Sequence, residues 1–98
     1  MPAYLICLFD AIHDREALQR YMPIAAASIA TFGGRYLVRG DSVIESLEGS
    51  APKHVIVIEF ADADRLREWY RSEDYAPALE IRERAGPRDL FVAEAVSR

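Results

Sequence analysis

The stretch FGGRYLVRG, residues 32–40, joins the end of an apolar-faced helical segment to a strand. Its two consecutive glycines end the helix, and one of them is expected in a left-handed conformation. The strand that follows, residues 35–39, is rich in Tyr, Leu and Val, which normally bury at least one face of a strand. Arg35 and Arg39 lie in this strand, and a buried arginine needs a partner. These two arginines are therefore the first candidates for a site.

The chain before this stretch predicts a strand and a long helix. Residues 3–9 form a continuous apolar run of strand length, as in a central strand covered on both faces. Asp14 is placed to cap a helix, because its carboxylate can accept a hydrogen bond from an unpaired amide of the first turn. Apolar residues then recur at spacings of three and four as far as the two glycines. Pro23 removes the hydrogen bond back to Gln19, so we expect a kink or a break near Tyr21.

Two extended segments follow the strand at residues 35–39. A turn at Gly40 and Asp41 precedes residues 43–47, which are expected to form a short extended piece. Residues 54–60, HVIVIEF, are the strongest strand of the chain, because β-branched residues fill their centre.

Two helices and a last strand complete the chain. Asp62 caps the first of these helices, and the second begins at Ser72 or Asp74. Pro77 favours the start at Asp74, because proline fits the first turn of a helix. A Gly-Pro pair then ends this helix, and residues 89–95 form the last strand.

The predicted order of elements over residues 1–98 is strand, helix, strand, strand, helix, strand, in one domain. This is the ferredoxin-like βαββαβ arrangement, an α+β fold with a four-stranded antiparallel sheet and its helices on one face. The strands are nevertheless apolar on both faces, since Tyr4, Ile6 and Leu8 alternate with other apolar residues. An apolar sheet face of this size is expected to be buried by a partner, most simply a second copy related by a twofold axis. We therefore predict a homodimer.

Composition and charge narrow the class of protein. The chain is 51% hydrophobic and 29% charged, an ordinary globular mixture, and its net charge of −4 argues against a nucleic-acid partner. The N-terminal apolar run lacks a basic leader and is too short to span a membrane. The single cysteine, Cys7, cannot form an intrachain disulfide, which fits a reducing cytosol. We expect a soluble cytoplasmic protein with neither a nucleic-acid nor a membrane partner.

The charged residues of the two central hairpin strands suggest an ion pair. If Leu37 pairs with Val57, Arg35 falls opposite Glu59, and period-two alternation puts Arg39 on the same side. Such a pair is either a structural contact that fixes the register or a binding point for a carboxylate or an enol. No catalytic, cofactor or metal-binding motif accompanies it, so no cofactor or metal is expected.

A pocket is expected between the sheet and residues 69–82. The apolar stripe of this segment must face the core, while the polar ends of its tyrosine and arginine side chains need hydrogen-bond partners at the edge of the core. The simpler alternative is that the aromatic residues only fill the core and that the guanidinium of Arg82 is only solvated at the surface. The candidate ligand-binding residues are Tyr36, Arg39, Glu59, Trp69, Tyr75 and Arg82.

Four runs carry a family resemblance: GGRYLVRG, VIESLEG, HVIVIEF and EWYRSEDYAPALEIRERA. They resemble the family catalogued as domain of unknown function 1330 (DUF1330), over essentially the whole chain. The resemblance implies the dimeric α/β-barrel superfamily, in which two ferredoxin-like subunits close a barrel between their sheets. Relatives at that level include cofactor-independent monooxygenases, muconolactone isomerase-like enzymes and haem-binding members. Haem finds little support here, because neither His13 nor His54 stands on a predicted pocket-lining helix.

Three functions remain open from the sequence. The first is a protein that binds a small anionic or phenolic organic molecule. The second is a cofactor-independent monooxygenase or isomerase of the dimeric α/β-barrel superfamily. The third is a non-catalytic association domain whose polar residues only fix its dimer. The sequence leaves open whether the chain is an enzyme.

Overall fold

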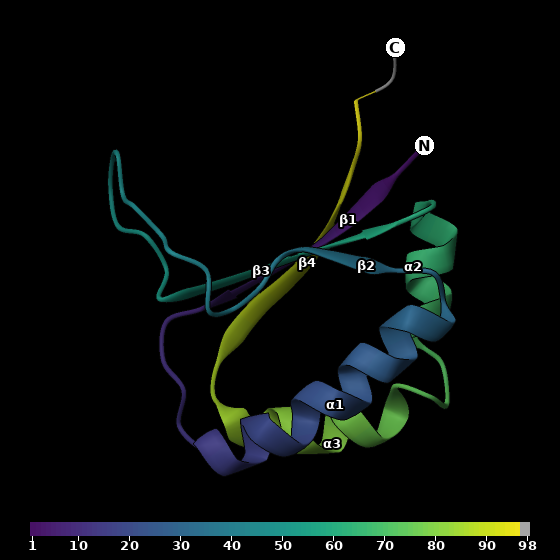
Figure 1. Cartoon of the computed structure of the whole chain (residues 1–98), viewed down its shortest axis with the longest axis horizontal. Coiled ribbons are helices and arrows are strands. Elements are labelled where there is room, and N and C mark those ends of the chain that lie inside the picture. The colour runs from purple at the N-terminus through teal and green to yellow at the C-terminus, as the bar shows by residue number, and fades with distance from the viewer. Residues whose placement is uncertain (97–98) are drawn as a thin grey trace.

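The sheet is built around its two most apolar strands, β1 (Ala3–Phe9) and β3 (His54–Phe60), which pair antiparallel along their whole length. The computed structural model describes residues 1–96. Strands β2 (Arg35–Val38) and β4 (Arg88–Glu94) add to the two sides of this pair and give the order β2-β3-β1-β4. Three helices cover one face of the sheet, namely α1 (Arg15–Thr31), α2 (Ala63–Tyr70) and α3 (Ala76–Ala85) (Figure 1). The predicted ferredoxin-like α+β fold is therefore confirmed.

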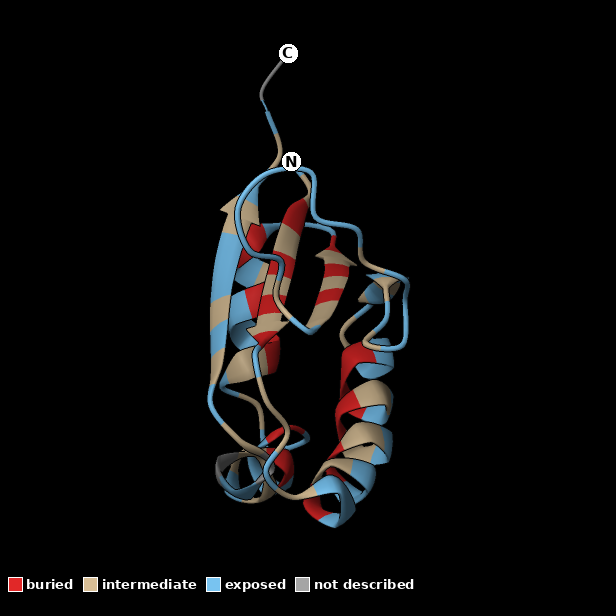
Figure 2. Ribbon diagram, turned by 90° about the vertical axis from the view of Figure 1, so that its left-hand side faces the viewer, coloured by how far each residue is buried: buried red, intermediate tan, exposed pale blue. Residues whose placement is uncertain are grey.

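The helix-facing side of the sheet forms the core. Alternate residues of β1 are buried, as the alternating colours of the central strands show (Figure 2). Leu5 and Cys7 pair with Ile58 and Ile56 of β3. Phe60, Leu66, Trp69 and Tyr75 are the largest fully buried side chains. The sheet and the segment that contains α2 and the start of α3 therefore share one core.

Helix α1 begins as predicted but is not interrupted. Asp14 caps it by accepting a hydrogen bond from the amide of Ala17 at 3.0 Å. The helix then continues through Pro23 to Thr31, so the predicted break near Tyr21 is wrong. Pro23 is exposed, while Tyr21 and Ala25 on either side of it are buried in the core. Packing of this buried face holds the helix together across the missing hydrogen bond.

The turn after α1 follows the prediction. Gly33 has a φ of 77°, the left-handed conformation that favours glycine. A Cβ atom on Gly34 would lie 2.7 Å from a methyl carbon of Ile29, so only glycine fits between α1 and the start of β2.

The register between β2 and β3 was predicted only in part. Arg35 lies opposite Glu59 as expected, but a bulge follows Tyr36, and Val38 takes the predicted place of Leu37 opposite Val57. The prediction that Arg35, Arg39 and Glu59 share one side of the sheet is therefore wrong.

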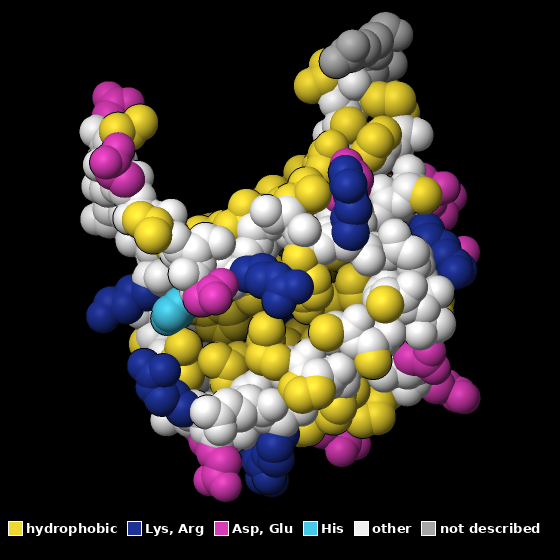
Figure 3. Space-filling model, in the orientation of Figure 1, with side chains coloured by type: hydrophobic (Ala, Val, Ile, Leu, Met, Phe, Trp, Pro, Cys, Tyr) yellow, Lys and Arg dark blue, Asp and Glu magenta, His cyan; other side chains and the backbone are white. Residues whose placement is uncertain are grey.

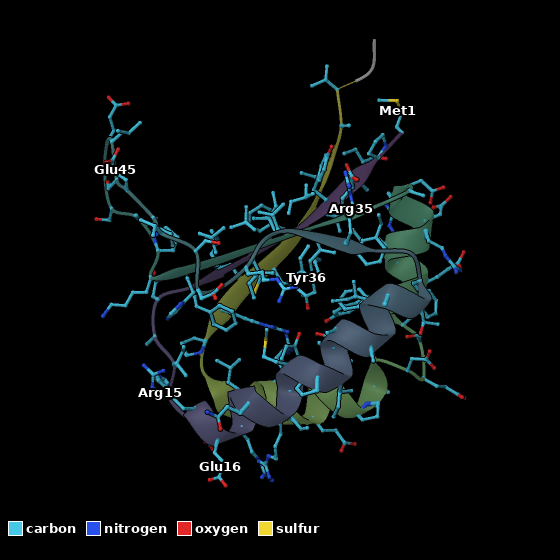
Figure 4. The ribbon with its side chains drawn as sticks, viewed as in Figure 1. Met1, Arg15, Glu16, Arg35, Tyr36 and Glu45 are labelled. Atoms are coloured by element: carbon cyan, nitrogen blue, oxygen red, sulfur yellow. The ribbon has the colours of Figure 1, made fainter. Side chains whose placement is uncertain are left out.

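The two arginines lie on different sides of the sheet. Arg35 donates to Glu59 at 2.9 Å on the face without helices. The Arg39 guanidinium lies 5.2 Å from the ring of Tyr36, which is paired with buried Ile58 on the helix side. Figure 4 shows the side chains of Arg35 and Tyr36 pointing to opposite sides of β2.

Residues 40–53 form a projecting arm, which we call the arm. The predicted extended piece at residues 43–47 forms no strand, because no other strand lies beside it to pair with. The arm rises from the sheet on the side opposite α1 and α3 (Figure 1). Its side chains Val43 and Leu47 are 99% and 85% exposed.

The C-terminal half follows the prediction with shifted boundaries. Asp62 caps α2 through the amide of Arg65 at 2.7 Å. Helix α3 begins at Ala76 rather than at Asp74, and Pro77 lies in its first turn as proposed. Strand β4 starts at Arg88, one residue before the predicted start.

The second face of the sheet is apolar and carries no helix. Tyr4, Ile6 and Leu8 are only half-buried there, and Leu37 and Phe91 are 46% and 45% exposed. Figure 3 shows this apolar surface between two projections, the arm and the chain ends. Within residues 1–96, no helix is long and apolar enough to cross a membrane.

The uninterrupted α1 leads to a prediction for Pro23→Ala. The restored amide can donate to the carbonyl of Gln19 and the ring clash disappears, so the free energy of unfolding should rise by about 1–3 kcal/mol. Urea denaturation followed by circular dichroism measures this. Ala30→Gly, at another exposed position of α1, is the control and should lower the free energy by about 1 kcal/mol. A lower stability of Pro23→Ala would contradict the prediction.

Candidate functional site

A half-buried arginine lies between the sheet and the helices. Arg88, at the start of β4, donates from Nη1 to the hydroxyl of Tyr21 and from Nη2 to that of Tyr75, each at 3.1 Å. The two hydroxyls are themselves 2.8 Å apart and hydrogen-bonded. Tyr21 comes from the buried face of α1, and Tyr75 precedes the first residue of α3. The cluster therefore ties together α1, α3 and β4.

No carboxylate neutralises Arg88 among the described residues. Its guanidinium instead lies against the rings of Phe9 and Tyr21, 5.6 and 5.0 Å from their centroids. Its Nε atom is buried without a hydrogen-bond partner in the part of the chain described. The charge is therefore stabilised by hydroxyls and aromatic faces, and one of its donors remains unused.

Burial disfavours the ionised forms of three titratable groups around Arg88. Burial raises the pKa of Tyr75 far above its ordinary value, and the neighbouring Tyr21 adds to the shift. Burial also raises the pKa of Cys7, although Arg88 opposes the shift, and the pKa of Tyr36, although Arg39 opposes it. Burial works against the charge of Arg88, yet Tyr21 and Tyr75 keep its pKa above the ordinary value. At neutral pH, Arg88 is the charged member of this group.

A small enclosed cavity adjoins the cluster. It measures about 20 Å³, the space of about one water molecule, and Cys7, Tyr36 and Arg88 contribute polar groups to its wall. The hydroxyl of Tyr36 makes no hydrogen bond with the residues that the structure describes. Tyr36 is therefore a second polar group available to a molecule that enters this space.

Trp69 forms part of the wall of this cavity. Its Nε1 donates to the hydroxyl of Ser28 at 2.9 Å, and its ring packs on Tyr75 with centroids 4.2 Å apart. Both aromatic residues are fully buried and their polar groups are hydrogen-bonded, so Trp69 shapes the wall of the cavity and Tyr75 supports it from behind, and neither offers a free polar group.

A larger depression, which we call the hollow, opens between the sheet and α1 (Figure 3). It has a volume of about 320 Å³ and a largely apolar wall. Its polar lining residues are Arg15, Arg39, Asp41 and His54. Met22 and Ile56 line both the hollow and the small cavity. Those two side chains therefore separate the hollow from Arg88. The apolar wall residues are Phe9, Ile12, Leu18, Met22 and Ile56.

A second depression, which we call the arginine pocket, lies at the β4 edge beside α2 and α3. It measures about 510 Å³, and four arginines line it. Asp89 is the acidic residue of its wall, and its apolar residues include Leu66, Tyr70 and Val92. The four arginines are Arg67, Arg71, Arg82 and Arg88.

The six candidate residues from the sequence occupy several places. Tyr36 and Trp69 line the small cavity, Tyr75 packs against Trp69, and Arg39 lies in the wall of the hollow. Arg82 lines the arginine pocket on the other side of Arg88. Glu59 lies on the opposite face of the sheet, where it binds Arg35.

Two residues of the cluster, Tyr21 and Arg88, are not among the six candidates from the sequence. Tyr21 was read only as part of the apolar stripe of its helix, and Arg88 was placed just outside the last strand. Arg88 precedes Leu90 by two residues, so period-two alternation puts both on the helix-facing side of β4. Starting the strand one residue earlier would have revealed a charged residue at a core position. No group of three or more metal-binding side chains occurs in the part of the chain that the structure describes.

Comparison with known proteins gives a family and a fold. The model of a family described as "Domain of unknown function (DUF1330)" matches residues 2–96. No curated protein shows significant similarity to the chain.

Several solved structures share the fold at low sequence identity. A protein of unknown function from Rhodopseudomonas palustris is 16% identical, with a TM-score of 0.75 over 99% of this chain and 84% of that one. A dimeric ferredoxin-like protein of unknown function from Jannaschia sp. CCS1 is 14% identical, with a TM-score of 0.63 over 97% and 100%. SnoaB, a cofactor-independent oxygenase from Streptomyces nogalater, is 11% identical, with a TM-score of 0.64 over 99% and 94%. At identities this low, the structural similarity establishes the fold alone.

The contacts of Arg88 predict a difference between two neighbouring tyrosines. Tyr75→Phe removes a buried hydroxyl that accepts from the half-buried guanidinium and should lower the free energy of unfolding by about 1–3 kcal/mol. Tyr70→Phe is the matched control and should change it by less than about 0.5 kcal/mol, because the Tyr70 hydroxyl makes no hydrogen bond with the described residues. Urea denaturation of both variants measures the difference, and equal effects would contradict the role given to Tyr75.

Proposed function

The chain belongs to the DUF1330 family, and we propose that it binds a small organic molecule with an anionic or phenolic group between its sheet and its helices. The observation that carries this proposal is Arg88, a half-buried cation with neutral hydroxyl partners and a buried, unused Nε donor. A partly desolvated charge without a counter-ion favours the binding of an anion. A purely structural role would be served as well by an apolar side chain of similar size.

The hollow is the proposed entrance for this ligand. Its apolar wall suits an aromatic or aliphatic body, and Arg39 beside the ring of Tyr36 adds a cation at the margin. Movement of Met22, a flexible side chain, would join the hollow to the small cavity. The polar end of the ligand would then meet the hydroxyl of Tyr36 and the guanidinium of Arg88.

The proposed site therefore combines residues from several elements. Tyr36 and Arg88 bind the polar end, Tyr21 and Tyr75 orient Arg88, Trp69 forms the wall, and Arg39 attracts the ligand. Glu59 and Arg82 face other surfaces and are left out of this site.

A second candidate function is cofactor-independent oxygenation or isomerisation of the same class of ligand. It is supported by the fold shared with the oxygenase SnoaB and by the presence of Arg88 and Tyr36 in the wall of the small cavity. Such reactions pass through an enolate or a phenolate, and a desolvated arginine stabilises that anion more strongly than water does. A tyrosine hydroxyl such as that of Tyr36 can donate a hydrogen bond to it.

We also propose that the chain forms a homodimer through the open face of its sheet. Three of the similar structures are described as dimeric proteins with a ferredoxin-like fold. The half-buried apolar residues of β1 and the exposed Leu37 and Phe91 form a self-complementary surface for such a contact. If the chain neither binds a ligand nor catalyses a reaction, the remaining function is that of an association domain, which acts through this contact.

Ligand binding is tested with aromatic carboxylic acids and phenols against their methyl esters and ethers. At 100 times the dissociation constant a ligand adds about 2.7 kcal/mol to the free energy of unfolding, so the melting temperature should rise by several degrees. The acids should stabilise the protein and the esters should not. Arg88→Met should abolish the shift, whereas Arg35→Met, the same change in the exposed pair with Glu59, should leave it intact.

Oxygen uptake with each compound that binds separates the two candidate functions. Uptake that Tyr36→Phe slows would favour the oxygenase, and binding without turnover would favour the binding protein. Equal shifts by acids and esters, or unchanged binding by Arg88→Met, would refute the proposed site.

The dimer leads to a separate prediction. Light scattering should give twice the 11.1 kDa mass of the chain at micromolar concentration. Val57→Asp places a carboxylate on the open face and should halve this mass, because a buried unpaired charge is costly. Thr31→Asp, at an exposed position of α1, is the control and should leave the mass unchanged. A wild-type monomer would refute the dimer.

A further inference from the structure

The tip of the arm combines exposed apolar residues with acidic ones. Val43 and Leu47 are almost fully exposed, although large apolar side chains normally find a contact. Asp41, Glu45 and Glu48 lie between and beside them, and no basic residue occurs in the arm before Lys53. The arm is therefore an acidic segment with two apolar anchors.

The arginine pocket has the complementary chemistry. Arg67, Arg71 and Arg82 lie around it, with Leu66, Tyr70 and Val92 as apolar surface. The chain as a whole carries a net charge of −4, so this local excess of cations runs against the average. Arg67 already pairs with Asp64 at 3.1 Å, but both side chains are well exposed, and such pairs contribute little. The pocket therefore suits an acidic partner with apolar side chains.

We propose that the arm of each subunit docks into the arginine pocket of its partner, an inference that rests on the proposed homodimer. Glu45 and Glu48 meet Arg67 and Arg71, and the apolar anchors of the arm cover the wall of the pocket.

The topology of the sheet makes this contact possible. The arm leaves the sheet after β2, and the arginine pocket adjoins β4, at opposite edges of the order β2-β3-β1-β4. A twofold axis that runs along the strands between two stacked sheets places β2 of one subunit over β4 of the other. The arm and the pocket then lie on the same side of the dimer, and both copies of the contact form together.

The arm is also long enough. Stacked sheets lie about 10 Å apart, and a leg of six extended residues reaches about 20 Å. Each half of the arm has about this length, so its tip can pass the edge of the partner's sheet and reach the layer of helices behind it. Figure 1 shows the arm projecting to the open side of the sheet, where the partner would lie. The same orientation directs it away from the helix layer of its own subunit.

Charge reversal tests the contact without disturbing the core. Glu45→Arg with Glu48→Arg reverses the charge of the arm at two positions, and Arg67→Glu with Arg71→Glu does the same in the arginine pocket. All four positions are exposed. Each double variant should raise the dissociation constant of its homodimer by roughly 10- to 100-fold at low salt. Glu73→Arg with Glu80→Arg, an equal charge change at exposed positions outside the pocket, is the control and should leave it unchanged.

A mixture of the two variants gives the decisive result. In a heterodimer the reversed arm meets the reversed pocket, and the two unaltered elements meet each other, so both contacts are restored. Mixing the weakened homodimers should therefore produce a heterodimer with nearly the wild-type dissociation constant, seen by native mass spectrometry and analytical ultracentrifugation.

Three outcomes would overturn the proposal. Unchanged dimerisation of the reversed arm would show that the arm is not part of the interface, while the homodimer itself would stand. Failure of the mixture to form heterodimers would show that the arm does not meet the arginine pocket. Stabilisation of the wild-type dimer by inorganic phosphate, lost in the pocket variant but not in the arm variant, would show that a free anion occupies the pocket instead.

Discussion

The hydrogen bonds of the half-buried Arg88 are the contact through which α1, α3 and β4 are joined. Its guanidinium donates to hydroxyls from α1 and from the start of α3, while its own backbone begins β4. Residues 67 positions apart in the chain meet at this point. A cation partly removed from water must be compensated, and here the compensation comes from two hydroxyls and two aromatic faces. The same guanidinium lines the small cavity between the helices and the sheet.

This arrangement places one positive charge among neutral polar groups in the interior. Cys7, Tyr36 and Tyr75 are neutral at neutral pH, and burial raises the pKa of each further, so the positive charge has no ionised neighbour among them. In a medium of low polarisability, such a charge acts over a longer range than at the surface. Under the proposed function, it would favour the anionic form of a ligand over the neutral form. The apolar wall of the hollow would add selection by shape and hydrophobicity.

The fold was predictable because its signals are local. Alternating apolar runs, the caps Asp14 and Asp62 and the left-handed Gly33 each act over a few residues, and the structure keeps all of them. Tertiary packing decided the features that failed: it carried α1 through Pro23, and a bulge after Tyr36 shifted the register of β2. The candidate site was visible only in part for the same reason. Tyr36, Trp69 and Tyr75 could be named from their residue types, whereas the meeting of Tyr21 with Arg88 depends on which faces of α1 and β4 come together.

Strand β2 has a consequence for how the two sides of the sheet could be coupled. Its adjacent residues face different environments, as period-two alternation requires: Arg35 lies on the open face beside Glu59, and Tyr36 borders the cavity next to Arg88. The strand is an edge strand held on one side only, by β3. If the proposed dimer and the proposed ligand both form, they contact opposite faces of the same four residues. Assembly and ligand binding would then be linked thermodynamically through the backbone of β2.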